Sequence, residues 1–306
     1  MDELKISIVI VNYNVKELLL TCLRSLYHFH IDSSFFEVIV VDNESKDDSC
    51  DAIRQEFPQV ILIENNTNAG FPKANNQGFE IAKGQYIFML NPDTEFKENS
   101  LDRILKYMEE NESVDLLGPG LLNTDGSRQQ SVWRFPSLSS VFCESFYLKF
   151  LLKKKNYLDK NFEQTFEAES FSGAAIFFRS NVLQKIGNLD ETMFWIEDVE
   201  FCYRAVKNNL KCVYFPETKI LHHIGQSAKK NYNISLSNQI FNKIKFFKKQ
   251  HSVAQWLLIV AMSYLQVILK IGIFGMLSPF KTVYKLKAQA YLYTLPKIYN
   301  PPKGIA

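Results

Sequence analysis

The segment that ends at Asp93 carries the strongest chemical signal in the sequence. In Phe88-Met89-Leu90-Asn91-Pro92-Asp93, an apolar run stops abruptly at Asn-Pro-Asp, which is typical of a buried strand that ends where polar groups are needed. Open α/β sheets bind ligands at the carboxyl ends of their strands. A carboxylate there can hold a divalent cation on a substrate's phosphates, because hard cations prefer oxygen ligands. The alternative is that Asp93 only begins a turn.

Two adjacent carboxylates, Glu197 and Asp198, offer acid–base chemistry at the start of a predicted helix. Acidic side chains in a first turn commonly serve the helix dipole. The functional interpretation is that one of them faces a pocket and acts as a general base. The preceding Met193-Phe194-Trp195 would then form an apolar wall that raises its basicity and could stack on a sugar.

The pair His222-His223 precedes the turn Ile224-Gly225-Gln226-Ser227. A lone histidine is usually structural, but a histidine at the end of a strand beside a glycine-containing turn is a plausible metal ligand. Together, Asp93 and His222 would leave coordination positions for diphosphate oxygens and water. Which of the two histidines binds stays open at this point.

Alternating strands and helices in the first ninety residues predict an α/β fold with a mostly parallel sheet and right-handed crossovers. A capping box of Ser45 and Asp48 is expected to open the second helix, and Pro72 suits the first turn of the third. The expected strands are 5–12, 35–41, 60–64 and 86–90, and the expected helices are 16–29, a helix ending at 57, and 72–83.

Polar side chains follow three of these strands, at Asn12-Tyr13-Asn14, at Asp42-Asn43-Glu44-Ser45 and at Asn91-Pro92-Asp93. Parallel strands bring such ends to one edge of a sheet, so this edge is the predicted nucleotide or sugar site. Asp42 could accept hydrogen bonds from a base or ribose there, or it could cap the following turn.

The second half is less regular. Val199, Cys202 and Val206 are expected to face inward from a helix at 197–208, and small residues at 172–175 would let another group approach the backbone closely. Further elements are a helix at 98–111, a hairpin turn at 123–126, and strands at 171–178, 211–215 and 219–223.

The net charge of +2 gives no case for binding nucleic acid. Five scattered cysteines without a C-x-x-C pair suit a reducing compartment. A strand that begins within a few residues of Met1 leaves no room for a signal peptide. The sequence therefore predicts a cytoplasmic protein.

The character changes after about residue 232. The stretch Lys243–Lys249 is basic with interleaved aromatic residues, and Val253–Leu277 is apolar with Lys270 as its single charge. The second stretch is long enough to cross a bilayer, but its polar residues Gln255, Ser263, Gln266 and Lys270 do not fall cleanly on one face. A span, a helix on the membrane surface and a packed soluble helix all remain open. The basic stretch would suit anionic headgroups on the cytoplasmic side.

The chain resembles the family 2 inverting glycosyltransferases with a GT-A fold, particularly their bacterial rhamnosyltransferase-like branch. The resemblance covers residues 6 to about 250 and rests on the order of its motifs, each of which is weak alone. The motifs are Ile8–Asn14, Val40–Ser45, Asn68–Phe71, Asn75–Gly78, Leu90–Asp93, Ser172–Ala175, Ile186–Glu191, Glu197–Glu200 and His222–Ser227.

The resemblance implies a role for each matching residue. Asn12 and Tyr13 look like part of the nucleotide pocket, and Asp42 looks like the residue that bonds the pyrimidine base. Asp93 matches the last carboxylate of the family's D-x-D metal motif, whose first position is Asn91 here. Asp198, next to Glu197, matches the general base, and His222 matches the histidine that can complete binding of Mg²⁺ or Mn²⁺. Further substrate-binding residues implied are Asn68, Gly70 and Asn75. Apart from the resemblance, Asn91 could help to position the ligand at the strand end, and Trp195 could stack on a sugar.

The implied activity is inverting transfer from a UDP- or dTDP-sugar to a hydroxyl of a glycan acceptor. The tail makes a lipid-linked acceptor in surface-polysaccharide assembly plausible, at the inner face of the cytoplasmic membrane. The implied organisation is a GT-A domain at 1–232 and a helical, membrane-associating segment at 233–306. Two alternatives are a sugar-phosphate nucleotidyltransferase, disfavoured because residues 9–16 hold no glycine, and a non-catalytic membrane scaffold.

Overall fold

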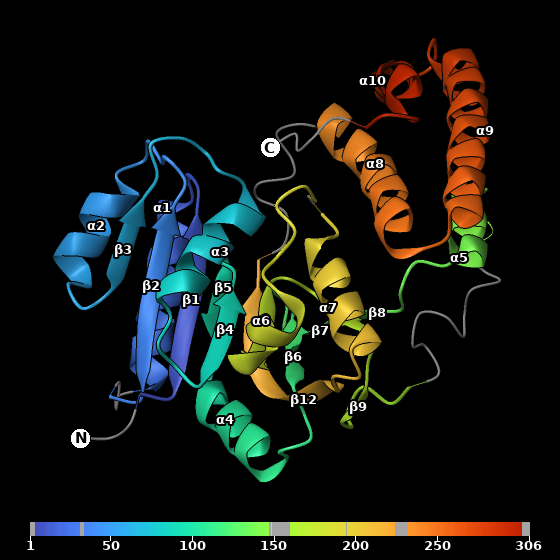
Figure 1. The fold of residues 1–306 in the computed structure, drawn as a ribbon. Coiled ribbons are helices and arrows are strands. Elements are labelled where there is room, and N and C mark those ends of the chain that lie inside the picture. Colours follow the sequence, from blue (N-terminus) through green and yellow to red (C-terminus); the bar gives the residue numbers. More distant parts are fainter. Residues whose placement is uncertain are drawn as a thin grey trace.

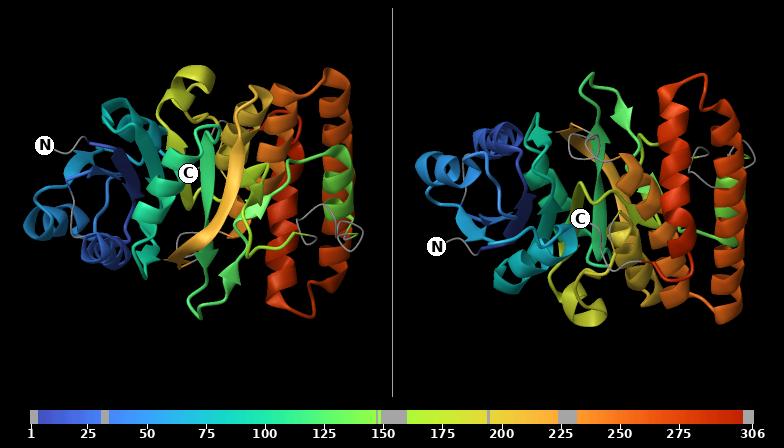
Figure 2. Two further views of the ribbon diagram at one scale, coloured as in Figure 1. Left: turned by 90° about the horizontal axis from the view of Figure 1, so that it is seen from below. Right: turned by 90° about the horizontal axis from the view of Figure 1, so that it is seen from above.

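A central mixed sheet with helices on both faces dominates the computed structural model, which describes residues 4–30, 34–146, 148, 160–193, 195–223 and 232–301 (Figure 1). The helices of the last third of the chain lie at the end of the molecule opposite to the first strands (Figure 2). The predicted α/β class is confirmed.

The first half forms the parallel part of the sheet. Strands β1 (Ile6–Asn12), β2 (Phe36–Asp42), β3 (Ile61–Glu64) and β4 (Tyr86–Leu90) run in the order β3-β2-β1-β4. They alternate with α1 (Lys16–Phe29), α2 (Ser49–Glu56) and α3 (Phe71–Ile81). These elements match the predicted ones closely, since each is a continuous apolar run or a run with helical spacing.

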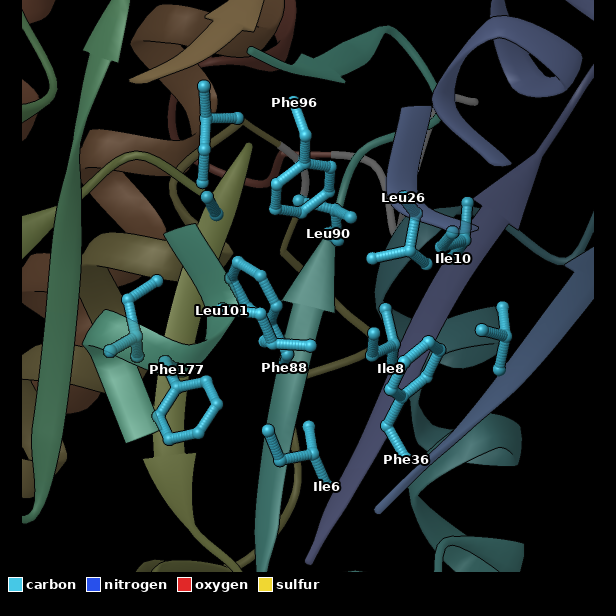
Figure 3. Packing of buried hydrophobic residues seen from close by; sticks show 14 of the residues in the cluster. Ile6, Ile8, Ile10, Leu26, Phe36, Phe88, Leu90, Phe96, Leu101 and Phe177 are labelled. Atoms are coloured by element: carbon cyan, nitrogen blue, oxygen red, sulfur yellow. The ribbon is translucent and has the colours of Figure 1, made fainter. Parts of the chain in front are cut away.

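Strand β1 is buried on both faces because helices cover both sides of the sheet. Ile6, Ile8 and Ile10 pack in the cluster that contains the apolar face of α1, which Figure 3 shows from close by. Val9 and Val11 point the other way, into the cluster that contains α3. This alternation explains why β1 is apolar at nearly every position.

The second half completes the sheet in the order β4-β11-β6-β12-β5. β11 is antiparallel to β4 and β6, whereas β12 is parallel to β6 and antiparallel to β5. The strands are β5 (Thr94–Phe96), β6 (Leu116–Leu122), β7 (Arg128–Gln129), β8 (Val132–Trp133), β9 (Phe166–Glu167), β10 (Ser170–Phe171), β11 (Ala175–Arg179) and β12 (Cys212–His222). The helices are α4 (Ser100–Glu110), α5 (Leu138–Ser145), α6 (Asn181–Ile186) and α7 (Glu197–Lys207).

Four local predictions are wrong. Ser45 and Asp48 form no capping box, since α2 begins after Asp48 without a side-chain cap. The strand expected at 171–178 is interrupted between β10 and β11, and those expected at 211–215 and 219–223 are one strand whose register shifts after Phe215. Val206 is 39% exposed, because α7 buries Phe201, Cys202 and Ala205 instead.

Three further helices form the C-terminal layer: α8 (Tyr232–Gln250), α9 (Val253–Leu277) and α10 (Thr282–Thr294), followed by the short η3 (Leu295–Lys297). They pack on each other around a separate apolar cluster that includes Met193 and Ile196 from the segment before α7. This layer is therefore joined to the segment that carries Glu197 and Asp198. Within the described residues, α9 is the helix that is long and apolar enough to cross a membrane.

Gly78 sets how closely α3 lies on β1. A Cβ atom at this position would stand 2.3 Å from Cγ1 of Val9, a buried β-branched residue that cannot swing aside. We expect Gly78→Ala to lower the free energy of unfolding by about 1–3 kcal/mol, the usual cost of overpacking. Gly272→Ala in α9 is the matched control, because its Cβ would meet nothing within 4 Å. Urea unfolding of both variants measures the difference, and equal stability would contradict the close approach.

Candidate active site

Hydrogen bonds between side chains join the carboxyl ends of β1 and β2. Asn12 Nδ2 donates to Asp42 Oδ1 at 2.7 Å, and Asp42 Oδ2 accepts from the backbone N–H of Ser45 at 2.8 Å. The Ser45 hydroxyl accepts from Asn12 Nδ2 at 3.0 Å and from the backbone N–H of Asn14 at 2.9 Å. Both alternatives for Asp42 thus stay physically possible: it caps the following turn, and its carboxylate keeps lone pairs for a ligand.

Ser45 belongs to this site, whereas the sequence predicted that it caps α2. Its hydroxyl bridges the ends of two strands instead of capping α2. The signal available was its place directly after Asp42-Asn43-Glu44, at the end of a predicted parallel strand.

Three of the predicted substrate-binding residues keep an unpaired oxygen. The Oδ1 atoms of Asn12, Asn75 and Asn91 are buried and have no hydrogen-bond partner among the described residues. A buried acceptor without a partner is costly and usually marks a place for a donor from water or a ligand. These three oxygens therefore have hydrogen-bonding capacity that the described residues do not use.

Asn68 and Gly70 shape the entry into α3. The Asn68 side chain accepts from the backbone N–H of Gly70 at 2.9 Å, so it is used locally. Gly70 has φ of +83° and ψ of 159°, a conformation that residues with a Cβ atom rarely adopt. A Cβ atom at this position would meet no other atom within 4 Å. The glycine is thus needed for the backbone turn at the entry into α3.

Asp93 and His222 come together although 128 residues separate them in the chain. Antiparallel pairing of β5 with β12 sets Thr94 opposite His222, and this register brings His222 Nε2 to 3.3 Å from Asp93 Oδ1. His223 turns away from Asp93, with its Nε2 at 3.3 Å from Glu95 Oε2. The geometry therefore distinguishes the two histidines, and His222 is the one beside Asp93. Ile224–Ser227 lie outside the described residues.

Gln129 orients the His222 ring, and sequence reasoning missed it. Its Oε1 lies 2.7 Å from His222 Nδ1, and its Nε2 donates to the His222 carbonyl at 3.1 Å. A carbonyl oxygen can only accept, so Nδ1 carries a proton and Nε2 is the ring atom that faces Asp93. The only signal for Gln129 was its position in the strand after the predicted hairpin turn.

The donor set fits a divalent cation. A deprotonated imidazole nitrogen and a carboxylate oxygen are both ligands of divalent cations, and Nε2 of His222 and Oδ1 of Asp93 lie close enough to bind one together. No group of three or more His, Cys, Asp or Glu residues converges within the described ranges. Two protein ligands nevertheless suit Mg²⁺ or Mn²⁺ in a phosphate site, because such ions keep waters and bind substrate phosphates.

Asp198 is held by backbone donors at the start of α7. Its Oδ2 accepts from Gly173 N–H at 2.7 Å, and its Oδ1 accepts from Val199 N–H at 2.7 Å. The next carbonyl, that of Ala174, accepts from Asn91 N–H at 2.9 Å. The loop between β10 and β11 therefore ties the Asp198 carboxylate to the end of β4.

Burial raises the pKa of both adjacent carboxyls, and for Glu197 the charge of Asp198 raises its pKa further. The backbone donors to Asp198 oppose this shift without cancelling it. Glu197 is buried and accepts from the backbone N–H of Ile196 at 2.9 Å, whereas Asp198 is partly exposed. Of the two, Asp198 is the one that could reach a substrate as a base.

Trp195 lies three residues before Asp198 in the chain. It is 44% exposed and its φ is +78°, a costly conformation for a bulky residue that often marks a functional position. Tyr13 at the end of β1 is 47% exposed. The predicted wall at 193–195 is wrong for Met193, which packs inward on the C-terminal layer, and Phe194 lies outside the described residues.

A hollow of about 530 Å³ lies beyond the ends of β2 and β3. It reaches Asp42 and Ser45 but none of Asp93, Asp198 and His222. The hollow therefore lies on the side where a nucleobase is expected, and it does not extend to the residues that would handle the phosphates.

Comparison with known proteins gives these features a context. Residues 7–187 match the model of glycosyl transferase family 2. A poly(ribitol-phosphate) beta-glucosyltransferase of Bacillus spizizenii is 37% identical over 119 residues, which are 38% of this chain and only 19% of that protein. An N-acetylglucosaminyl-diphospho-decaprenol L-rhamnosyltransferase of Mycobacterium tuberculosis is 25% identical over 70% of this chain and 75% of its own length.

Solved structures show the same fold at low identity. A mannosyltransferase from Pyrobaculum calidifontis, in complex with GDP-Man and Mn²⁺, aligns over 97% of this chain and 88% of its own with a TM-score of 0.57 at 16% identity. Residues 1–349 of Staphylococcus aureus TarS align over 97% and 92% with a TM-score of 0.54 at 14% identity. The predicted GT-A architecture is thereby confirmed.

Proposed function

The chain belongs to glycosyl transferase family 2, and we propose that it transfers a sugar from a nucleotide-sugar donor to a hydroxyl group of a glycan acceptor, with inversion at the anomeric carbon. The observation that carries the proposal is the convergence at the carboxyl end of β4. There, Asp93 lies against His222, and Asn91 is linked through the 172–174 loop to the carboxylate of Asp198.

The residues would divide the work as follows. Asp42 and Asn12 would hold the nucleobase and ribose beside the hollow at β2 and β3, with Tyr13 at its rim. The unpaired oxygens of Asn75 and Asn91 would accept from donor hydroxyls, and the loop of Asn68 and Gly70 would border the sugar. Trp195 would offer its exposed ring as a stacking face for a sugar.

Asp93 and His222 would hold Mg²⁺ or Mn²⁺, which would offset charge on the leaving diphosphate. The structurally similar mannosyltransferase from Pyrobaculum calidifontis, solved in complex with GDP-Man and Mn²⁺, supports this proposal. Gln129 would keep Nε2 of His222 free for its ligand role by holding the proton on Nδ1.

Asp198 would take the proton from the acceptor hydroxyl as that oxygen attacks the anomeric carbon from the face opposite to the leaving group. A single displacement of this kind inverts the configuration. Glu197, buried beside it, would favour its protonated form, because burial and the charge of Asp198 raise its pKa. The raised pKa of Asp198 brings its basicity closer to that needed near neutral pH.

The donor is proposed to be UDP- or dTDP-linked, and the acceptor to be a lipid-linked glycan at the cytoplasmic face of the membrane. A relative named for transfer to N-acetylglucosaminyl-diphospho-decaprenol supports such an acceptor. The apolar helix α9 supports attachment of residues 233–306 to a membrane surface, while residues 1–232 would form the catalytic domain.

The test is a panel of UDP-, dTDP- and GDP-sugars, scored by thermal shift and by slow donor hydrolysis with and without EDTA. A true donor binds only the folded state and raises Tm. We expect one donor class to stabilise the protein with metal present, and its hydrolysis to stop with EDTA. Stabilisation by sugar phosphates plus nucleoside triphosphates, with release of pyrophosphate, would instead identify a nucleotidyltransferase.

The pH dependence of turnover follows from the raised pKa of Asp198. A general base works only when deprotonated, so kcat falls as the pH drops through its pKa. Because burial raises that pKa above the ordinary aspartate value of about 3.9, we expect the acid limb of kcat to lie well above that value. The profile is measured at saturating donor and metal, so that protonation of metal ligands does not contribute. An acid limb at the ordinary value would contradict the assignment.

A further inference from the structure

The outward side of α9 is apolar at every exposed position. Between Val253 and Leu277, each exposed residue is Val, Ala, Leu, Ile, Gly or Met. The large ones recur at helical spacing and form one stripe, which we call the α9 face. Its main members are Leu258, Leu265, Ile268, Leu269, Ile273 and Met276.

The polar residues of α9 lie on the opposite side, against the protein. Ser263 and Lys270 are buried, and Gln266 Oε1 accepts from the Ser145 hydroxyl of α5 at 3.1 Å. The Lys270 ammonium group lies 5.4 Å from the ring centre of Tyr291 in α10. Ser263, Gln266 and Lys270 therefore share one face of α9, and the expectation that the polar residues of this helix do not share a face is wrong for them.

The layer behind α9 is bonded to the catalytic part of the molecule. In α8, Lys249 pairs with Asp190, Lys245 donates to the carbonyl of Thr192 at 3.1 Å, and Gln250 donates to Glu200 at 2.8 Å. α9 packs against α5, α8 and α10. If α9 crossed a bilayer, it would have to leave these helices or carry their lysines into the hydrocarbon, which is costly.

Charge is divided sharply along the chain. All 33 acidic residues lie before residue 218, together with 22 of the 35 Lys and Arg. Residues 218–306 contain 13 lysines and no acidic residue. The C-terminal layer is thus strongly cationic, and it forms one end of the molecule (Figure 2). Such a charge complements an anionic surface.

The ends of the α9 face carry groups typical of a lipid interface. The ring centres of Trp256 and the 59% exposed Tyr299 lie 5.7 Å apart with the rings tilted, and the Lys248 ammonium group lies 5.2 Å from the centre of the Trp256 ring. Exposed Lys281 and Lys285 follow the other end. Tryptophan, tyrosine and lysine favour the headgroup level, where apolar and polar surroundings meet.

We infer that the α9 face lies flat on an anionic lipid bilayer, with its apolar side chains at the acyl boundary and the neighbouring lysines at lipid phosphates. The inference rests on the membrane attachment proposed above and fixes its orientation: α9 lies in the membrane plane and does not span it. The bilayer would thereby hold the catalytic part at a set height above lipid-linked acceptors.

Flotation of the full-length protein with vesicles tests the inference. We expect binding to vesicles that contain phosphatidylglycerol. The double variant Leu265→Glu/Ile268→Glu should bind at least about a hundred-fold more weakly, because it places two carboxylates in the acyl boundary. Val206→Glu places one carboxylate at an exposed apolar position on α7, outside the α9 face, and should bind normally.

Lysine variants separate the electrostatic part and stay informative if the double variant misfolds. Each of Lys281→Gln and Lys285→Gln should weaken binding to anionic vesicles about five-fold and leave binding to phosphatidylcholine unchanged. Donor hydrolysis in solution is measured in parallel. If the native protein hydrolyses the donor but does not float with the vesicles, the inference is overturned and the proposed function is not. If the native protein floats but hydrolyses no donor, the proposed function is overturned and the inference is not.

Labelling distinguishes the flat orientation from a span. Single cysteines replace Ser252 and Thr282, which flank α9, in a Cys50→Ser background in which the other four cysteines are buried. A membrane-impermeant maleimide added outside the vesicles should label both positions. Protection of one position until the vesicles are lysed would show a span. A stable dimer in solution that Leu265→Glu/Ile268→Glu dissociates, with no vesicle binding, would show that a second copy covers the face.

Discussion

Asp198→Asn should lower kcat by roughly 10²- to 10⁴-fold while donor affinity stays within a few-fold of the native value. The substitution removes the proton-accepting charge but keeps the size of the side chain and one acceptor for the Gly173 N–H, which Asp198 engages at 2.7 Å. Steady-state kinetics give kcat, and calorimetry with the sugar nucleotide gives the affinity.

Stability supplies a second readout for Asp198. An aspartate whose pKa is raised by folding binds its proton more tightly in the folded state than in the unfolded one. Folding stability is therefore lost as the pH rises from the unfolded pKa through the folded pKa, and the cost persists at neutral pH. Asp198→Asn removes that pH-dependent cost, although it leaves one of the Gly173 and Val199 N–H groups without its acceptor. The Tm of the variant should therefore rise relative to the native Tm as the pH increases through the folded pKa. A Tm difference that does not change with pH would contradict the raised pKa.

Glu197→Gln is the matched comparison, one residue away on the same turn. Glu197 is buried and bonded to the Ile196 N–H, so we expect its loss to reduce turnover much less than Asp198→Asn. If Glu197→Gln abolished turnover and Asp198→Asn did not, the base would have to be reassigned to Glu197.

His222→Ala should reduce metal-dependent turnover at least about 100-fold and raise the Mn²⁺ concentration needed for half-maximal activity, because a cation stabilises the leaving charge by several kcal/mol. His223→Ala is the control, since its ring lies against Glu95 and not Asp93. It should stay within a few-fold of the native enzyme.

Asp93→Asn and Gln129→Leu extend this series. Asp93→Asn removes the carboxylate from the proposed pair and should match His222→Ala. Gln129→Leu should cost less, about 10- to 100-fold in metal affinity, the usual effect of losing a group that orients a ligand. Equal effects of His222→Ala and His223→Ala on the Mn²⁺ requirement would refute the assignment of the metal to His222.

The elements that frame the site were accessible to sequence reasoning because each carries its own signal. β1 and β4 are continuous apolar runs, and α9 spans the residues predicted for it, Val253–Leu277. Helices are local structures, and buried parallel strands are apolar throughout. Asp93 was therefore placed at a strand end from the sequence alone.

The contacts between distant segments were not accessible in the same way. Nothing local reveals that Gln129 faces His222, or that Ser45 bridges Asn12 and Asn14 rather than capping a helix. These contacts depend on sheet order and register. The motif order of the family brought Asp93, Asp198 and His222 together as an expectation, which periodicity could not have done.

The side of α9 that the protein covers was not accessible for a related reason. From the sequence, Ser263, Gln266 and Lys270 weakened the interpretation of α9 as a membrane span, because the helix alone does not show which side is covered. α5 and α10, far apart in sequence, supply the surfaces that cover these polar residues. The exposed side that remains is apolar.

The central claim is that Asp93, His222 and Asp198 serve one bound donor. Crystals grown with Mn²⁺ and the nucleoside diphosphate of the identified donor, measured at the manganese absorption edge, test it most directly. We predict one anomalous peak bonded to Asp93 and to Nε2 of His222, in contact with the diphosphate, with the Asp198 carboxylate facing the same cleft. A peak held by other residues, or an Asp198 carboxylate closed off from the diphosphate, would contradict the account.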